Sequence, residues 1–438
     1  MMDWDFVLRW LPWLYLAMAV AGASLTLNAL APVRRNRVLL LPSFLAGTVA
    51  VELAAYLLVA HCLAAVSFVA AGALTGPVGW SAVIVSGVSA VGLSVLFVQG
   101  VGAAAAVRRA LLPVLGRPAR PVPGLWRLLV PFPLRGATDR VTRNVTFAKV
   151  AGQRLRLDVY HPKRSVPGKR WPAVIHVHGG GWTVGDKREQ GVPLMAVVAD
   201  RGFVGFNINY RLSPGATWPD HLVDVKRAIA WVRAHADEYD VDPSCIAIAG
   251  GSAGGHLASM AALTADDPSL QPGFEDADVS VAAVAAFYAI YDLTDEKGRH
   301  VPGFIETLLQ PIVLKAFYDQ VPERFAEASP IHRLHRRAPP FFVIHGDRDT
   351  LAPLADARDF VQALRATSGQ PVAFAELRGA QHSFDFFISP RSLPVLEGVA
   401  EFFEHVAHDA SARSDRLDAQ PDAGGPEHDV DALEAHRA

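Results

Sequence analysis

The chain has 438 residues, of which 51% are hydrophobic and only 19% are charged. It is longer than one typical domain and more apolar than most soluble proteins, which indicates that part of it avoids water. The formal net charge of -2 and the lack of a zinc-finger or RNA-binding signature exclude an obvious nucleic acid partner. The two cysteines, Cys62 and Cys245, stand in apolar stretches without a C-x-x-C pair, which argues against a disulfide framework or a cysteine metal site.

Residues 1–110 predict a helical transmembrane region. Trp10 to Leu30 is an apolar stretch of spanning length, and between Val38 and Val107 the only formally charged residue is Glu52. Asp3 and Asp5 stand where a cleaved signal peptide would have basic residues, so we expect this region to be an anchor.

Basic residues on either side of the longest apolar run predict the topology. Arg34 to Arg37 form the cluster RRNR, and a second group follows the apolar run: Arg108, Arg109, Arg117 and Arg120. Positive loops stay in the cytoplasm, so an even number of crossings should separate the two groups. Crossings near Leu39 to His61 and near Trp80 to Val107 would give three spans, with the amino terminus outside and the remainder inside. Four spans are the alternative.

Three further features of these regions leave alternatives open. Glu52 and His61 could form an intramembrane polar site, or could equally make a helix contact or reach the membrane surface. Residues 111–140, rich in proline and arginine, predict a juxtamembrane linker that either lies against an anionic bilayer or is simply solvated. Residues 409–438 lack periodic apolar positions and predict a disordered tail.

Residues 141–408 predict one soluble domain with a single core. VTFAKV and RLRLDVY predict an opening hairpin, and six short apolar runs suit strands buried on both faces: AVIHVH, FVGFNIN, CIAIAG, VAAVAAFYA, FFVIHG and VAFAEL. Helical patterns fall between several of these runs: Pro219–Tyr239, His256–Thr264, Leu354–Thr367 and Ser392–His408. The alternation predicts an α/β fold with a mostly parallel, eight-stranded sheet flanked by helices.

A glycine triplet, Gly179 to Gly181, follows the third predicted strand in the stretch HVHGGGWTVGD. Its backbone N–H groups have no side chains in the way and can stabilise an oxyanion. A flexible turn is the plainer interpretation of the triplet alone. A phosphate-binding loop is not favoured, because neither G-x-G-x-x-G nor G-x-x-x-x-G-K-[ST] occurs in this stretch.

Gly250 to Gly254 form the pattern G-x-S-x-G around Ser252, between a predicted strand and a predicted helix. The pattern requires this context, because a sharp turn presents the serine hydroxyl and the flanking glycines relieve the crowding. The helix amino terminus adds partial positive charge, and the N–H of Ala253 can join the oxyanion donors.

A serine hydroxyl needs a base to take its proton, and the base needs a carboxylate to orient it. FFVIHGDRDTLAP places Asp347 and Asp349 after the seventh predicted strand, and VAFAELRGAQHSFDFF places His382 after the eighth. Each residue alone has a plainer interpretation, as a helix cap or a surface histidine. The chain order Ser252, Asp349, His382, with each residue just beyond a strand, favours a catalytic triad.

Four motifs occur in order along this domain: HGGGW, NYRLSP, GGSAGGH and HGDRDTLAP. With them, residues 141–408 resemble the α/β-hydrolase superfamily, in the branch of the hormone-sensitive-lipase-like carboxylesterases, of which a membrane-anchored subset has a similar layout. Gly251, where an acid usually precedes the serine, and HGDRD are closer to feruloyl-esterase-like and acetyl-esterase-like relatives.

The resemblance implies that Ser252 is the nucleophile, His382 the general base and acid, and Asp349 its orienting partner. It also implies an oxyanion hole, supported by a braced loop and by the glycines of the motifs. The oxyanion hole would consist of the N–H groups of Gly180, Gly181 and Ala253, and the supporting residues would be His178, Gly179, Gly250 and Gly254.

No H-E-x-x-H pattern in the sequence supports a metal site. We expect structural or surface roles for four further histidines: His256, His332, His335 and His345. We expect neither a metal nor an organic cofactor. Gly303 to Phe317, within residues 291–328, falls where the resembled fold usually carries a lid over the acyl pocket, although its apolar face could be plain core packing.

These features predict a membrane-anchored serine carboxylesterase or lipase that acts on a small-molecule or lipid ester, with the catalytic domain on the cytoplasmic side. An acyltransferase or an amidase with the same triad is one alternative. A non-catalytic membrane sensor or binding protein is another, and its signature would be a missing triad member. None is missing from this sequence. The sequence does not predict an oligomeric state.

Overall fold

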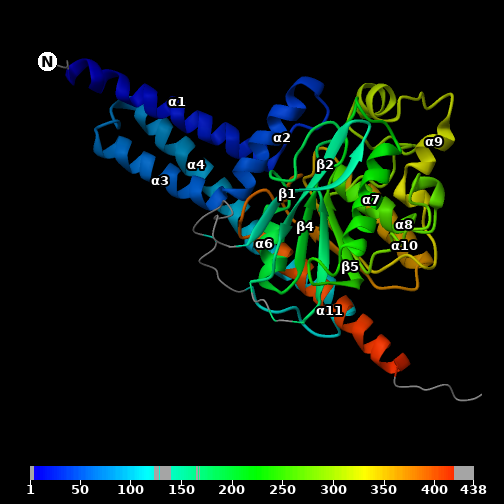
Figure 1. Cartoon of the computed structure of the whole chain (residues 1–438). Coiled ribbons are helices and arrows are strands. Elements are labelled where there is room, and N and C mark those ends of the chain that lie inside the picture. Colours follow the sequence, from blue (N-terminus) through cyan, green and yellow to red (C-terminus); the bar gives the residue numbers. More distant parts are fainter. Residues whose placement is uncertain (1–3, 123–127, 129–139, 164–165, 167, 419–438) are drawn as a thin grey trace, which may run out of the picture.

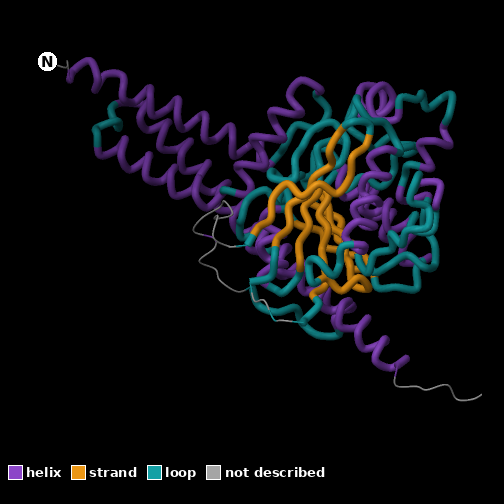
Figure 2. The backbone as a smooth tube through the Cα atoms, in the orientation of Figure 1, coloured by secondary structure: helices purple, strands orange, loops and turns teal. Residues whose placement is uncertain are grey.

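The computed structural model describes residues 4–122, 128, 140–163, 166 and 168–418. In these ranges the chain forms an elongated helical bundle, which contains the amino terminus, and an α/β domain built on one sheet (Figures 1 and 2).

The α/β domain contains the predicted eight-stranded sheet, in the order β1-β2-β4-β3-β5-β6-β7-β8. β1 and β2 form an antiparallel hairpin, β2 pairs antiparallel with β4, and the remaining neighbours are parallel. The strands are β1 (Val141–Val150), β2 (Gln153–Tyr160), β3 (Trp171–Val177), β4 (Val204–Ile208), β5 (Val241–Gly251), β6 (Val284–Phe287), β7 (Phe341–Gly346) and β8 (Val372–Leu377). The predicted fold class is confirmed.

Helices cover both faces of this sheet, which is why β4 and β7 are buried at every position and read as continuous apolar runs. One face packs against α7 (Asp220–Ala234), α8 (Ala253–Leu263) and α10 (Leu354–Thr367). The other face packs against α5 (Ala103–Leu115), α6 (Val192–Asp200) and α11 (Ser392–Asp418). Shorter elements are Pro268–Leu270, α9 (Pro322–Glu327) and Pro330–His332.

Two helices differ from the sequence expectation. α6 was not predicted, because VPLMAVVAD is buried at most positions and has no polar face to produce a helical period. α11 continues to Asp418, beyond the boundary of residue 408 from which we expected a disordered tail. The rest of that expected tail, residues 419–438, lies outside the described residues.

The bundle contains α1 (Trp4–Leu30), α3 (Ala54–Ala70) and α4 (Gly76–Val101), which pack side by side (Figure 1). Within the described part of the chain, two helical stretches are long and apolar enough to cross a membrane, Arg9–Leu30 and Gly76–Leu115. The crossing expected over Leu39 to His61 is instead broken: α2 (Arg37–Glu52) and α3 meet at an angle of 84°. α2 lies against the α/β domain while α3 runs back along the bundle (Figure 1).

The contacts of Glu52 explain the break between α2 and α3, because its side chain binds the α/β domain and not the bundle. Its Oε1 accepts a hydrogen bond from Arg391 Nε at 2.9 Å, and its Oε2 accepts one from Ser389 Oγ at 2.6 Å. The proposed polar site of Glu52 with His61 is therefore wrong. His61 Nε2 lies 3.2 Å from the carbonyl oxygen of Ser86 on α4, which is the helix contact that we had kept as the alternative.

α5 and the residues after it also belong to the α/β domain. Val107 and Leu111 are buried in the same core as β8 and α11. Arg117 and Arg120 then bind carboxylates on α11: Glu401 at 2.5 Å and Glu404 at 2.7 Å. These arginines of the predicted linker are therefore paired with protein carboxylates. Residues 123–127 and 129–139 of that linker lie outside the described residues.

Candidate active site

Ser252 stands at the sharp turn between β5 and α8, where the sequence pattern predicted it. Its backbone has φ 55° and ψ −122°, a conformation that is strained for a residue with a side chain. Its N–H donates to the carbonyl oxygen of Phe287 at 2.9 Å, which ties the turn to β6. The motif glycines are sterically required: a Cβ would lie 2.4 Å from a carbonyl oxygen at Gly250, and 2.1 Å from one at Gly254.

The structure brings Asp349 and His382 into contact, with Asp349 Oδ2 2.7 Å from His382 Nδ1. The other carboxylate oxygen accepts the N–H groups of Leu351 and Ala352, both at 2.8 Å. Burial alone would raise the pKa of Asp349, but the opposing effects of His382 and its hydrogen bonds outweigh burial and hold the pKa below its ordinary value. Asp349 is therefore suited to remain ionised beside the imidazole.

Asp347, the other candidate for the carboxylate that orients His382, binds a different residue. Its Oδ1 accepts the N–H of Gly379 at 2.6 Å, so it joins the loops that follow β7 and β8. Of the two, only Asp349 has a hydrogen bond to His382 among the described residues.

The glycine triplet forms a tight loop after β3. Gly180 has φ 109° and Gly181 has φ 58°, and a Cβ on Gly180 would lie 2.0 Å from the carbonyl oxygen of Val184. The N–H of Gly179 already donates to Gln190 Oε1 at 2.7 Å. Gly180 and Gly181, the two candidate oxyanion donors of this loop, line the same pocket as Ser252.

The resemblance implies that His178 braces the glycine loop and that Ala253 is an oxyanion donor. His178 Nδ1 is 2.8 Å from the carbonyl oxygen of Gly179, and the ring stacks on Tyr210 with centroids 4.5 Å apart. Burial lowers the pKa of His178, which favours the neutral ring. Ala253 is fully buried at the first position of α8, directly after Ser252.

Ser252, His382 and the glycine loop open into one pocket of about 400 Å³, within the range of roughly 300–1,000 Å³ that is typical of small-molecule sites. No aspartate, glutamate, lysine or arginine lines it among the described residues, and no cluster of candidate metal ligands occurs among them. The lining residues are Leu41, Phe44, Leu45, Thr48, Val49, Gly180, Gly181, Val184, Gln190, Ser252, Leu351, His382, Ser383, Phe386 and Phe387.

Comparison with known proteins identifies the family. The BD-FAE family model matches residues 157–364. "Probable carboxylic ester hydrolase LipM" of Mycobacterium tuberculosis is 40% identical over 406 residues, which cover 89% of this chain and 93% of LipM. The chain belongs to this α/β-hydrolase family. The resemblance inferred from the sequence motifs is confirmed, as is the carboxylesterase class at the level of the family.

Other relatives of this hydrolase match mainly over shorter ranges. "Esterase LipQ" of the same organism is 46% identical over 251 residues, which are 57% of this chain and 59% of LipQ, less than two thirds of its length. Apo Thermogutta terrifontis esterase 2 has 27% identity and a TM-score of 0.51, over 64% of this chain and 96% of that one. "Truncated form of carbohydrate esterase from gut microbiota", at 24% identity and a TM-score of 0.53, covers 63% of this chain and 99% of that one and supports the fold alone.

Two residues that contact the candidate site, Gln381 and His345, had no signal for this role in the sequence patterns. Gln381 Oε1 accepts the N–H groups of Thr350 at 2.8 Å and His382 at 2.9 Å, which joins the loop of Asp349 to the loop of His382. His345 Nε2 lies 3.4 Å from Asp349 Oδ2, and burial lowers the pKa of His345. These contacts depend on side chains meeting across two loops, so neither could be found from spacing along the chain.

Aromatic side chains enclose the imidazole of His382. The ring of Tyr288 has its centroid 4.5 Å away, and its hydroxyl donates to the buried carboxylate of Asp385. Phe44 of α2 approaches edge-on, with centroids 5.9 Å apart, and Thr48 Oγ1 of α2 donates to the carbonyl oxygen of His382 at 3.2 Å. α2, which the sequence predicted to be part of the membrane region, thus contacts His382 directly.

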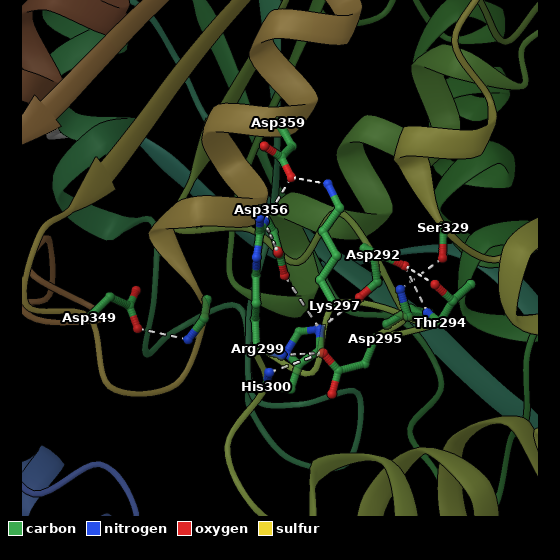
Figure 3. Close-up of polar contacts among 12 residues, drawn as sticks. Asp292, Thr294, Asp295, Lys297, Arg299, His300, Ser329, Asp349, Asp356 and Asp359 are labelled. Atoms are coloured by element: carbon green, nitrogen blue, oxygen red, sulfur yellow. Dashed lines mark hydrogen bonds and ion pairs between the residues drawn. The ribbon is translucent and has the colours of Figure 1, made fainter.

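The lid candidate is a π-helix, Phe304–Leu314, whose Leu309, Val313 and Leu314 are buried in the core. The loop before it is held on α10 by ion pairs, which Figure 3 shows: Arg299 Nη1 binds Asp356 at 2.9 Å and Asp359 at 2.7 Å. This packing supports the plainer alternative that we kept for the segment.

The other histidines lie where their predicted structural roles place them. His256 is fully buried: its Nδ1 accepts from Trp182 Nε1 at 3.3 Å and its Nε2 lies 2.7 Å from the carbonyl oxygen of Ala328. Burial lowers the pKa of His256 to about 4. His332 is exposed and His335 partly exposed, away from the pocket lining.

Proposed function

We propose that this protein is a membrane-anchored serine carboxylesterase that hydrolyses its substrate through an acyl-enzyme on Ser252. The observation that carries the proposal is the hydrogen bond between Asp349 and His382 in a pocket that also contains Ser252. Membership of an esterase family supports the same reaction class.

In the proposed mechanism, His382 removes the hydroxyl proton as Ser252 Oγ attacks the ester carbonyl. Negative charge develops on the carbonyl oxygen, where the N–H groups of Gly180, Gly181 and Ala253 stabilise it. When the tetrahedral intermediate collapses, the C–O bond to the alcohol breaks and His382 gives the proton to the leaving alcohol.

Hydrolysis of the acyl-enzyme repeats these steps with water. His382 takes a proton from water, the hydroxide adds to the acyl carbonyl, and the bond to Ser252 breaks as the serine recovers its proton. The low pKa of Asp349 keeps a negative charge beside the imidazolium in both steps. No cofactor is needed for either step.

The membrane part of the proposal rests on the apolar helices. Arg9–Leu30 and Gly76–Leu115 have the length and hydropathy of spans, and α3, which turns by 84° from α2 and runs along the bundle, supplies a third crossing. Arg34 Nη2 donates to the carbonyl oxygen of Asp347 at 3.3 Å, so the basic cluster Arg34 to Arg37 lies beside the α/β domain. The positive-inside tendency therefore favours a cytoplasmic location for that domain.

Labelling with a fluorophosphonate probe tests the nucleophile. We expect Ser252→Ala to abolish labelling of the purified full-length protein and Ser244→Ala, at an exposed position of β5, to leave it unchanged. Retained labelling of the Ser252 variant would refute the assignment. The side of the membrane is tested separately with right-side-out vesicles, in which added protease should spare the α/β domain, while its cleavage would contradict a cytoplasmic location.

A further inference from the structure

Helix α2 forms one wall of the candidate active site. Its contribution to the pocket lining follows a spacing of three and four residues, which places the side chains on one stripe of the helix: Leu41, Phe44, Leu45, Thr48 and Val49. The opposite wall, from the α/β domain, contains Ser252 and His382. The pocket therefore exists only where the apolar amino-terminal region and the α/β domain meet.

The position of α2 is fixed from both sides. On the bundle side, Ser43 Oγ donates to Asn28 Oδ1 at 2.5 Å, and Ala50 and Val51 pack with residues of α1 and α4. On the other side, Thr48 and Glu52 bind the α/β domain. These contacts on two sides hold α2 in place as part of the pocket wall.

The rim of this wall is apolar and open. Leu41 is 58% exposed, Leu45 55% and Val49 39%, although all three line the pocket. Val184, which also lines the pocket, is 63% exposed. This apolar groove leads to a candidate nucleophile, and its described lining contains no aspartate, glutamate, lysine or arginine. It therefore fits an uncharged hydrocarbon chain.

The start of α2 indicates where such a chain comes from. Arg34, Arg35 and Arg37 are exposed directly before and at the first residue of the helix, and Val38 and Leu39 are exposed directly after them. A basic cluster followed by an exposed apolar face is the pattern of a helix at a membrane surface.

We propose that the α2 stripe is the acyl-chain site of this enzyme, and that its occupant is the acyl chain of an uncharged lipid ester drawn from the bilayer. This inference rests on the proposed esterase function. The ester carbonyl would lie at Ser252 and the hydrocarbon along Leu41, Leu45 and Val49, so the anchor region supplies part of substrate specificity.

The test compares Leu45→Trp, which fills the groove, with Leu39→Trp, a change of the same size on the same helix outside the lining. The full-length protein in detergent is assayed on p-nitrophenyl acetate and p-nitrophenyl decanoate. For Leu45→Trp we expect the ratio of kcat/KM for decanoate over acetate to fall by about tenfold or more, and for Leu39→Trp we expect a ratio within about twofold of wild type.

Two controls keep this outcome interpretable. Leu45→Ala, which widens the groove, should shift the preference toward longer acyl chains. The rate of labelling by a small fluorophosphonate shows that each variant is folded with a working Ser252. Equal loss of decanoate and acetate turnover in Leu45→Trp, with labelling retained, would overturn the acyl-chain site while leaving the esterase proposal standing. A wild-type protein that cleaves neither ester and takes no label would instead overturn the proposed function.

A second measurement tests the source of the substrate. The protein is reconstituted in phosphatidylcholine vesicles that contain dioleoylglycerol, and release of oleate is followed. We expect hydrolysis by wild type and by Leu39→Trp, and loss of about tenfold or more by Leu45→Trp. Cleavage of the decanoate ester from solution with no hydrolysis of the diacylglycerol in the vesicles would overturn entry from the bilayer.

Discussion

The buried ion pair between Glu52 and Arg391 joins the bundle to the α/β domain, and breaking it should loosen that junction. The two side chains are 0% and 1% exposed, and Nε lies 2.9 Å from Oε1. Glu52→Gln keeps the shape of the side chain but removes its charge. The guanidinium of Arg391 then stays buried with a neutral partner and with the carbonyl oxygen of Arg378.

The expected magnitude follows from these contacts. Removing one partner of a buried pair costs about 3–5 kcal/mol, because the remaining charge is uncompensated. The two hydrogen bonds of the Glu52 carboxylate, each charge-assisted, are worth about 1.5–3 kcal/mol apiece, which agrees with that range. Since glutamine retains a neutral acceptor, we expect the lower end, about 3 kcal/mol.

Thermal unfolding of the full-length protein in detergent, followed by tryptophan fluorescence, measures this effect. At roughly 2–4 °C per kcal/mol, Glu52→Gln should lower the midpoint by roughly 6–12 °C. The matched control is Glu376→Gln, which removes a carboxylate from an exposed pair with Arg358, worth about 0–1 kcal/mol. If both variants melted at the same temperature, the reasoning about the buried junction would be refuted.

Three further outcomes are expected. Asp349→Asn should lower kcat by about 10⁴-fold on a soluble ester, and Asp347→Asn by less than about tenfold; the reverse order in steady-state kinetics would reassign the acid. Burial lowers the pKa of His256 to about 4, from about 6.5 in the unfolded chain. Between pH 6.5 and pH 4, roughly, the imidazole therefore binds a proton in the unfolded state and stays neutral in the folded state. The free energy of unfolding consequently falls as the pH falls from about 6.5 to about 4. His256→Gln should therefore reduce the pH dependence of the unfolding free energy by about 1.4 kcal/mol per pH unit in urea titrations, and an unchanged slope would contradict a buried neutral ring. Gly254→Ala would place a Cβ 2.1 Å from a carbonyl oxygen of β3, so it should cost about 1–3 kcal/mol or more and abolish fluorophosphonate labelling, whereas Gly369→Ala, with open space around it, should melt and label like wild type.

The α/β domain could be predicted well because its local signals agree with the final fold. β7, β8 and α10 begin and end at the residues that the sequence patterns predicted, since each is a continuous apolar run or a clear amphipathic period bounded by turns. The candidate triad residues could be proposed from the sequence for a related reason. In a parallel sheet the functional side chains follow the carboxyl ends of strands, so the order of strands along the chain also orders the candidate residues.

The junction with the bundle could not be predicted because its determinants are distant in sequence. Hydropathy alone favours one continuous crossing over Leu39 to His61, and the break at Leu53 depends on a contact between Glu52 and a residue 339 positions further along. The role of α2 in the pocket was missed for the same reason. Its stripe has the composition of a membrane helix, and only its position against the α/β domain distinguishes it.

The apolar helical run from Gly76 to Leu115 has a consequence for the choice of lipid. At 1.5 Å per residue its 40 residues extend about 60 Å, roughly twice the thickness of a bilayer hydrocarbon core, and its last part, α5, is packed inside the α/β domain. In the proposed membrane arrangement, a stiff helix rather than a flexible tether sets the height of the pocket above the lipid. Membrane thickness then regulates access to Ser252 through hydrophobic mismatch, so hydrolysis should differ between vesicles of short-chain and long-chain phosphatidylcholine, and equal rates in both would contradict this coupling.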